Sequence, residues 1–380
     1  MSRSLDCPGM LSQPYAKKKQ LIPIEGLLLA SDFNPANGYG EMSKQILSCL
    51  SHLAKISIAT PSHYHSVMES MGFADRVIGC YNDPSIRPVS CLSIQPIDPS
   101  MKKPAGIKNA LYTMWESSDL NPRIAKTMSL YDLILTPNSF NAARFTEQTG
   151  KPCEVVYHGC NTKLYVQDLN AYATRLKQSK TFTFGAAAHL GHGRVRKGFE
   201  RIVDWFVRAF PGKEKVQLLL KANDWTGNNF TVPDPRIKLI EKDLTDQECA
   251  EWIRSVDCYI DGSTFEGWGM WTHAAMATGR PVIATNYSAR CEYFQFQNHI
   301  PIGYTIEPAQ DIYVGLGHWA MPKSEDAIEA MRWAAKNKKA CLKIAERAYQ
   351  TTKHLTWEAN AKRIVSVLSK HDIIGRKVLL

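Results

Sequence analysis

Short apolar runs alternate with amphipathic helical stretches along most of this chain, and this alternation constrains the fold more than any other feature. The first run, GLLLAS at residues 26–31, precedes a glycine turn at residues 37–40 and a helical stripe that ends at Leu50. Continuous apolar runs are typical of strands buried on both faces of a parallel sheet. A strand, a glycine turn and a helix in this order predict a doubly wound α/β domain.

The same alternation recurs in the second half of the chain. Further strands are predicted at residues 55–60, 132–137, 153–159, 181–188, 216–222, 257–263 and 280–285, and helices at 197–210 and 356–370. A length of 380 residues suits two domains of about 150–200 residues each. Because the polar segment 169–180 separates the two series, we predict a boundary near residue 178. The expected division is a loose lead-in over 1–22, domains over 23–178 and 179–355, and a closing segment over 356–380.

Composition narrows the class of protein. With 44% hydrophobic and 22% charged residues the chain has a globular composition. No apolar run approaches the roughly 20 residues that span a bilayer, and the first twenty residues do not resemble a signal peptide. We therefore expect a cytoplasmic protein without a transmembrane segment. The ten cysteines include no C-x-x-C pair, which favours reduced thiols over disulfides or a zinc site.

The formal net charge of +10 raises the question of an anionic partner. Lys and Arg exceed Asp and Glu by 19 to 14 in residues 1–180 and by 27 to 22 in the rest, so the excess is evenly spread. The charge is compatible with a solvated basic surface, and also with attraction to nucleic acid, an anionic membrane or a nucleotide diphosphate. The basic clusters to consider are Lys17 to Lys19, Lys102, Lys103 and Lys108.

The stretch TFEGWGMWTHAAMATGRPVIAT, residues 264–285, predicts a ligand site. Glu266 follows a predicted strand, Gly267 and Gly269 stand beside it, and a helix begins within a few residues. Ligands of parallel sheets bind beyond the carboxyl ends of the strands, and a helix N-terminus attracts phosphate. A carboxylate there suits sugar hydroxyls, although Glu266 as a cap of the following helix is an equal alternative.

This stretch resembles the E-x-G-x-G…EAMA-x-G-x-PVIA signature of retaining glycosyltransferases of the GT-B fold, specifically glycosyltransferase family 4. Other segments resemble that family in its own order and together extend the likeness over nearly all of residues 24–370. They are GYGEMSKQIL, YTMWESSDL, LILTPNSFNAARFTEQTG, VVYHGCN, RKGFERIVDWFVRAF and TWEANAKRI. The ordered set is far more specific than any one segment.

The resemblance implies a fold, a reaction and a set of partners. The fold would be two Rossmann-like domains facing a central cleft, with the segment after residue 356 crossing back to the N-terminal domain. The reaction would be transfer of a sugar, with retention and without a required metal, from a nucleotide diphosphate sugar, a UDP- or GDP-sugar by preference. The front-face mechanism described for such enzymes needs no pair of catalytic carboxylates. The acceptor would be a glycan, a lipid-linked sugar or, as in some viral relatives, a modified DNA base.

The resemblance also assigns roles to particular residues. Lys197, together with Arg194 or Arg196, would neutralise the diphosphate, whose departure develops negative charge. Glu266 would hold the transferred sugar. The glycines Gly38, Gly40, Gly267 and Gly269, with Met270 after them, would let the backbone approach the donor.

Two positions depart from the family's pattern. Ala274 stands where a second glutamate usually binds the ribose of the nucleotide. His273 or Glu292 would substitute for it, or the donor differs, or the protein is a non-catalytic scaffold that binds a nucleotide or partner. Near the sugar, where many members place a histidine, this chain reads Trp115-Glu116, so Glu116 is a candidate contact for the sugar or the acceptor hydroxyl and Trp115 a packing residue. For His158 an imidazole turned to the cleft and a satisfied loop histidine are both open.

Overall fold

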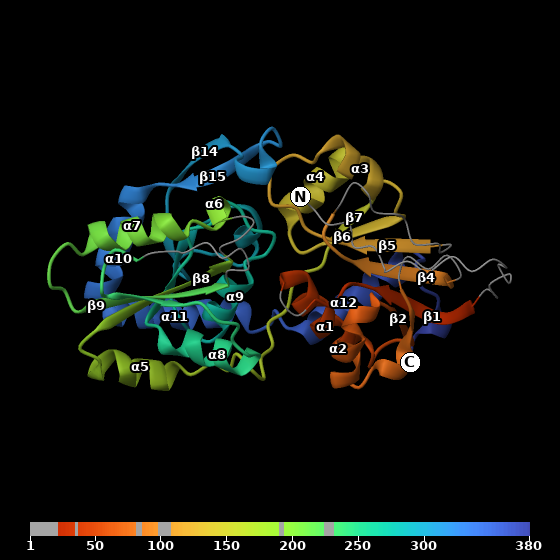
Figure 1. Ribbon diagram of the computed structural model, residues 1–380, viewed down its shortest axis with the longest axis horizontal. Coiled ribbons are helices and arrows are strands. Elements are labelled where there is room, and N and C mark those ends of the chain that lie inside the picture. Colours follow the sequence, from red (N-terminus) through yellow and green to blue (C-terminus); the bar gives the residue numbers. More distant parts are fainter. Residues whose placement is uncertain (1–21, 35–36, 81–85, 98–107, 190–193, 224–231) are drawn as a thin grey trace.

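The computed structural model describes residues 22–34, 37–80, 86–97, 108–189, 194–223 and 232–380 (Figure 1). Most of the predicted lead-in, with Lys17 to Lys19, lies outside the described residues, as do Lys102 and Lys103. Two groups of elements stand side by side in Figure 1, one formed mainly by the first half of the chain and one by the second.

The N-terminal half is built on a seven-stranded, wholly parallel sheet in the order β3-β2-β1-β4-β5-β6-β7. Its strands are β1 (Ile22–Ala30), β2 (Ile56–Ala59), β3 (Val77–Gly79), β4 (Ile86–Ile94), β5 (Lys108–Tyr112), β6 (Leu133–Thr136) and β7 (Cys153–Val155). Its helices are α1 (Gly38–Leu50), α2 (His65–Ser70), α3 (Pro122–Met128) and α4 (Ser139–Thr149). The predicted first strand and the helix after it are therefore confirmed. The glycine turn predicted over residues 37–40 is wrong, because α1 already begins at Gly38 and Asn37 caps it, and β3, β4 and β5 escaped prediction.

The second half carries a six-stranded parallel sheet in the order β10-β9-β8-β11-β12-β13. The strands are β8 (Phe182–His189), β9 (Val216–Asn223), β10 (Ile237–Ile240), β11 (Cys258–Ile260), β12 (Val282–Thr285) and β13 (Ile300–Ile302). The helices are α5 (Leu169–Gln178), α6 (Arg194–Lys197), α7 (Phe199–Ala209), α8 (Asp246–Ser255), α9 (Met270–Ala277), α10 (Ser324–Lys336) and α11 (Lys338–Thr352). An antiparallel hairpin of β14 (Tyr304–Pro308) and β15 (His318–Pro322) is added to this half.

The helix predicted over residues 197–210 is divided in two. Its second part, α7, buries an apolar stripe at the spacing of a helix face against the sheet. Gly198 separates α6 from α7 with φ +68°, and a Cβ at that position would lie 2.7 Å from the carbonyl oxygen of Gly262. The left-handed turn suits glycine and lets the chain change direction, so Arg196 and Lys197 lie on a separate short turn.

The segment predicted as a polar separator, residues 169–180, contains the helix α5. Tyr172 and Leu176 of this helix are buried in the core of the second half, and the Tyr172 hydroxyl donates to the carbonyl oxygen of Asp257 at 2.6 Å. By packing, α5 therefore belongs to the second half, ahead of the boundary that the sequence predicts near residue 178. The sequence analysis missed this helix because most of its residues are polar and only two, Tyr172 and Leu176, are buried.

The C-terminal helix α12 (Trp357–Lys370) lies against the first half of the chain, next to α1 (Figure 1). Trp357, Ala361 and Ile364 are buried in the same core as strands β1 and β2. The connection is tight, because a Cβ on Gly159 would lie 2.1 Å from the backbone nitrogen of Trp357. Among the described residues, every helix falls short of the length and apolar character that a bilayer span requires.

Candidate functional site

Two of the predicted site residues, Arg196 and Lys197, lie against Glu266, in the loop after β11. Glu266 is buried, and its backbone N–H donates to the Ser288 hydroxyl at 3.2 Å. Its Oε1 accepts from Lys197 Nζ at 2.6 Å and from Arg196 Nη1 at 3.3 Å. Burial opposes ionisation of Glu266, but Lys197 and Arg196 outweigh it and lower the pKa of the carboxyl. The two cations and the acid therefore form one charged group.

Arg196 joins the two halves of the chain. This side chain is only 6% exposed, and its Nη2 lies 2.9 Å from Oε2 of Glu116, which follows β5 in the first half. Burial disfavours its charge, yet Glu116 and Glu266 raise the pKa of the guanidinium above its usual value. Its Nε is buried and has no hydrogen-bond partner among the described residues. The side chain of Arg194 instead pairs with Glu200, so the structure brings Arg196, not Arg194, to Glu266.

The side chain of Glu266 does not cap the following helix. Helix α9 begins at Met270, and its N-cap residue is Gly269, without a capping side chain. Gly269 has φ +85°, and a Cβ there would lie 2.8 Å from the Tyr293 hydroxyl, so this position requires glycine. The alternative of Glu266 as a helix cap is therefore wrong, because its carboxylate turns to Lys197 and Arg196.

Two of the four predicted glycines, Gly267 and Gly38, lie where the two halves meet. The carbonyl oxygen of Gly267 accepts from Asn138 Nδ2 at 2.7 Å, and a Cβ on Gly267 would lie 2.9 Å from that of Met114. A Cβ on Gly38 would lie 3.7 Å from Sδ of Met270. Gly40 differs, since a Cβ there would lie 1.7 Å from the carbonyl oxygen of Asn34. Its glycine is thus already required by packing within the first half.

A buried ion pair beside Glu266 was missed from the sequence. Arg290 is fully buried, and its Nη1 lies 2.7 Å from Oδ2 of Asp261, which also accepts from the Thr272 hydroxyl at 2.9 Å. The guanidinium of Arg290 outweighs burial and holds the pKa of Asp261 below its usual range. Asp261 at the end of a predicted strand was a usable signal, whereas nothing near Arg290 in the sequence indicated its role.

The two residues predicted to replace the missing second glutamate are engaged elsewhere. His273 is buried, and its Nδ1 accepts from Trp268 Nε1 at 3.0 Å. Glu292 accepts from the backbone N–H of Ser139 at 2.6 Å, at the start of α4. Ala274 itself is buried in an apolar cluster. The role of either residue at a ribose stays a prediction that these contacts do not favour.

His158 lies in an aromatic enclosure between the two halves. Its ring centroid lies 5.6 Å from Trp268 and 5.5 Å from Trp357, and neither ring nitrogen has a hydrogen-bond partner among the described residues. It is therefore not the satisfied loop histidine that was one of the two alternatives. Burial lowers the pKa of His158 to about 3, and burial lowers that of His273 to about 3 as well.

Because the pKa values of these two histidines are lowered, we expect the free energy of unfolding to decrease in acid. An unfolded histidine titrates near pH 6.5, so between about pH 6.5 and 3 the unfolded chain binds more protons than the folded one. The stabilisation is complete above pH 6.5 and falls with decreasing pH, by up to about 1.4 kcal/mol per pH unit for each histidine. Urea unfolding at pH 7.5 and 5.5 measures this slope. His158→Phe should reduce the slope, because phenylalanine takes up no proton. A slope equal to that of the wild type would show that burial does not keep the His158 imidazole neutral.

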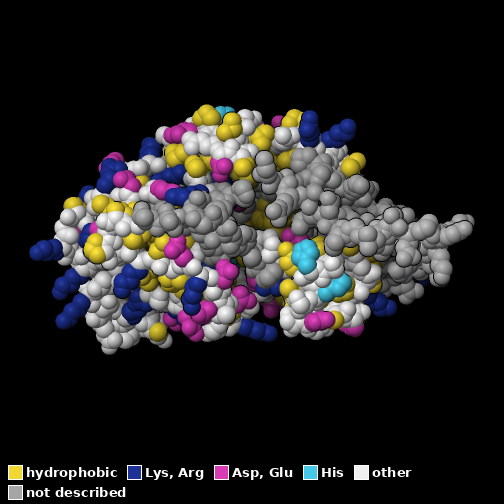
Figure 2. Space-filling view, viewed as in Figure 1, with side chains coloured by type: hydrophobic (Ala, Val, Ile, Leu, Met, Phe, Trp, Pro, Cys, Tyr) yellow, Lys and Arg dark blue, Asp and Glu magenta, His cyan; other side chains and the backbone are white. Residues whose placement is uncertain are grey.

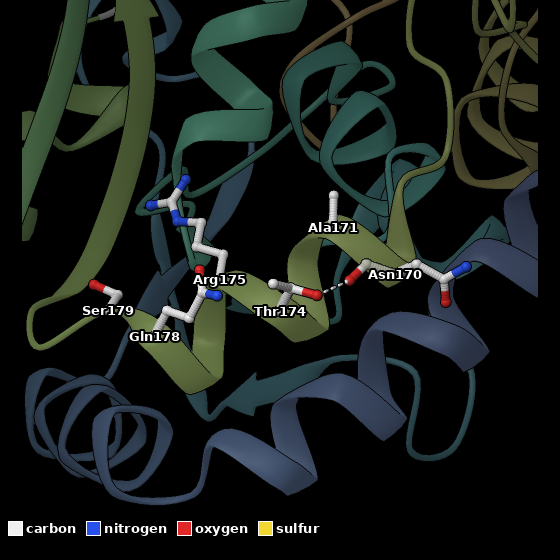
Figure 3. Close-up of a pocket in the computed structure, with 6 residues that line it drawn as sticks. All are labelled: Asn170, Ala171, Thr174, Arg175, Gln178 and Ser179. Carbon is white, nitrogen blue, oxygen red and sulfur yellow. Dashed lines mark hydrogen bonds between the residues drawn. The ribbon is translucent and has the colours of Figure 1, made fainter.

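One cavity elsewhere on the molecule lies on a single helix. A cavity of about 650 Å³ opens on α5 and is lined by Asn170, Ala171, Thr174, Arg175, Gln178 and Ser179 (Figure 3). All six residues come from one helix and the turn after it, and the cation among them already pairs with Asp257 at 3.1 Å. In Figure 2 the described Lys and Arg side chains on the visible face are interspersed with Asp and Glu, in keeping with the even spread of charge along the sequence.

Comparisons with known proteins establish what the chain resembles in space. No protein-family model matches the sequence, and no curated protein matches it. HepE of Anabaena, solved with UDP and glucose, superposes with a TM-score of 0.66 at 13% identity, covering 90% of this chain and 99% of that one. Sucrose-phosphate synthase of Thermosynechococcus elongatus gives a TM-score of 0.62 at 12% identity, covering 93% of this chain and 99% of that one.

A UDP-forming trehalose-phosphate synthase of Burkholderia xenovorans is similar over a smaller share, with a TM-score of 0.53 at 10% identity, covering 76% of this chain and 75% of that one. Likeness at such low identities shows the fold alone. The expected fold is confirmed by these neighbours and by the two parallel sheets. The chain therefore has the α/β architecture of the GT-B fold.

Proposed function

We propose that this protein is a glycosyltransferase that moves a sugar from a nucleotide diphosphate sugar to an acceptor hydroxyl, with retention of configuration and without a required metal. The observation that carries the proposal is the convergence of Arg196, Lys197 and Glu266 at the carboxyl edge of the second sheet. Structures with the same fold contain UDP and glucose, or UDP-glucose, which favours a UDP-sugar as the donor.

In this proposal the two cations receive the diphosphate. Lys197 Nζ and the Arg196 guanidinium are held next to each other by one carboxylate oxygen, so both are in place before a donor arrives. As the bond to the sugar breaks, negative charge grows on the leaving phosphate, and preorganised cations in a buried site stabilise it strongly. Glu266 shares Oε1 with both cations, and in this proposal it also accepts hydrogen bonds from the hydroxyls of the transferred sugar.

In this proposal Glu116 binds the acceptor hydroxyl. Its Oε2 contacts Arg196 across the boundary between the two halves. The same guanidinium contacts Glu266, so it lies between the two carboxylates. An acceptor hydroxyl held there would reach the sugar on the same face from which the phosphate departs. The proton of the acceptor hydroxyl can pass to an oxygen of the leaving phosphate. The reaction then needs no further carboxylate as a general base.

A panel of donors tests the proposal. Thermal unfolding of the full chain should shift upward with one of UDP-, GDP-, ADP- or TDP-sugars, and the shift should be lost in Glu266→Ala and in Lys197→Ala. Lys242→Ala, which removes an exposed lysine paired with Glu248, should keep it. The donor identified in this way is then incubated with an acceptor panel in EDTA, and the anomer of the product is assigned by NMR.

The same panel separates transfer from a scaffold role. Ala274 in its apolar cluster, with His273 and Glu292 engaged elsewhere, is the observation that favours a non-catalytic nucleotide- or partner-binding protein. A shift with a donor but no turnover would support that alternative. A product with inverted configuration, or turnover abolished by EDTA, would contradict retention or metal independence separately.

A further inference from the structure

The segment that follows β5 is held by the β14–β15 hairpin of the other half. The carbonyl oxygen of Glu116 accepts from Trp319 Nε1 at 2.8 Å, and the Ser118 hydroxyl accepts from the backbone N–H of His318 at 2.9 Å. The Ser117 hydroxyl donates to the carbonyl oxygen of Leu316. In Figure 1 the hairpin lies at the top of the second half, on the side where the two halves meet. The backbone around Glu116 is thus tied to the hairpin.

The side chain of Glu116 is held from two directions. Its Oε2 accepts from the Tyr313 hydroxyl at 3.2 Å and lies 2.9 Å from Arg196 Nη2. Tyr313 is largely buried, and its ring lies 5.1 Å from that of Trp115 and 5.8 Å from that of Trp319. The hydroxyl therefore has a fixed position, independent of the contact between Glu116 and the arginine.

Arg196 cannot pair with Glu116 and bind a diphosphate through the same nitrogen atoms at once. Its Nη1 is committed to the carbonyl oxygen of Phe265 and to Glu266, which stand in the same half. The Nη2 edge that faces Glu116 remains for a bidentate contact with phosphate, together with Nε, which has no hydrogen-bond partner in the described part of the chain. A carboxylate beside a bound diphosphate would also be repelled by it, because both carry negative charge.

We infer that the donor diphosphate displaces Glu116 from Arg196, an inference that rests on the proposed function. Glu266 contacts both cations within one half of the chain, whereas Glu116 reaches Arg196 only through its side-chain Oε2 and can leave it while its backbone stays bound to the hairpin. Tyr313, a positioning residue, retains the released carboxylate. Glu116 then becomes free for an acceptor hydroxyl only after the donor has bound, so binding is ordered with the donor first.

Calorimetric titration of the full chain with UDP, GDP and pyrophosphate tests the competition. Glu116→Gln keeps the shape of the side chain but removes its charge, so the nucleotide that binds the wild type should bind about tenfold more tightly. Glu325→Gln is the matched control, because it also removes a carboxylate paired with an arginine, Arg208, at the surface. This control should bind like the wild type.

Tyr313→Phe distinguishes the effect of the Glu116 charge from the effect of a weakened contact with the hairpin. This variant loses the hydroxyl contact and keeps the carboxylate, so its affinity should stay within about twofold of the wild type, a small fraction of a tenfold change. Equal tightening in Tyr313→Phe and Glu116→Gln, or unchanged or weaker binding in Glu116→Gln, would overturn the inference while the proposed function stands. Failure of the wild type and of Glu116→Gln to bind any of the three ligands would overturn both.

Discussion

Lys197→Met is expected to lower kcat/KM for sugar transfer by about 10²- to 10³-fold, the usual cost of removing one preorganised group from a developing negative charge. Lys197 Nζ lies 2.6 Å from Glu266 Oε1, so the ammonium is positioned by a buried acid. Its loss also leaves that acid with Arg196 as its remaining cation in direct contact among the described residues. Methionine preserves most of the apolar stem, which limits the change to the charge.

Initial rates of nucleoside diphosphate release from the identified donor measure this effect. Lys242→Met serves as the control, because Lys242 is an exposed lysine in an ion pair with Glu248. Near-equal rates for Lys197→Met and the control would show that the diphosphate is neutralised by other groups. A rise in KM with an unchanged kcat would assign Lys197 to ground-state binding instead of the departing charge.

Arg290→Met is expected to destabilise the protein by about 3–5 kcal/mol, because it breaks a buried ion pair and leaves Asp261 without its cation. Arg290 is fully buried and also donates from Nη2 to the carbonyl oxygen of Ser263 at 3.0 Å and to the Thr285 hydroxyl at 2.6 Å. The variant loses three polar contacts that join the ends of neighbouring strands.

Urea unfolding of the wild type and of Arg290→Met compares the two free energies of unfolding. Arg208→Met is the matched control: Arg208 pairs with Asp204 and Glu325 at the surface, where screening by water leaves such pairs with little effect on stability. Comparable unfolding midpoints for both variants would mean that Asp261 finds another partner or becomes neutral once Arg290 is gone.

Much of the architecture was predictable because its signals are local. Apolar strands followed by glycine turns and amphipathic helices indicated two parallel α/β sheets, and the structure has them. Strands β4 and β5 escaped because each has polar residues within it, such as Ser90, Ser93 and Asn109, which are buried in the sheet. Helix α5 looked like a separator because Tyr172 and Leu176 are its only buried residues.

The sequence by itself determined the alternation of strands and helices and placed Glu266 in a loop at the end of a strand, since both follow from short-range pattern. Only the tertiary structure decided which arginine meets it. Arg194 and Arg196 are two residues apart on one turn of helix, and the break at Gly198 together with the packing of α6 directs Arg196 inward. Likewise Glu116 and Tyr313 meet across 197 positions of sequence. Such contacts depend on how the two sheets are joined, and no local pattern carries that information.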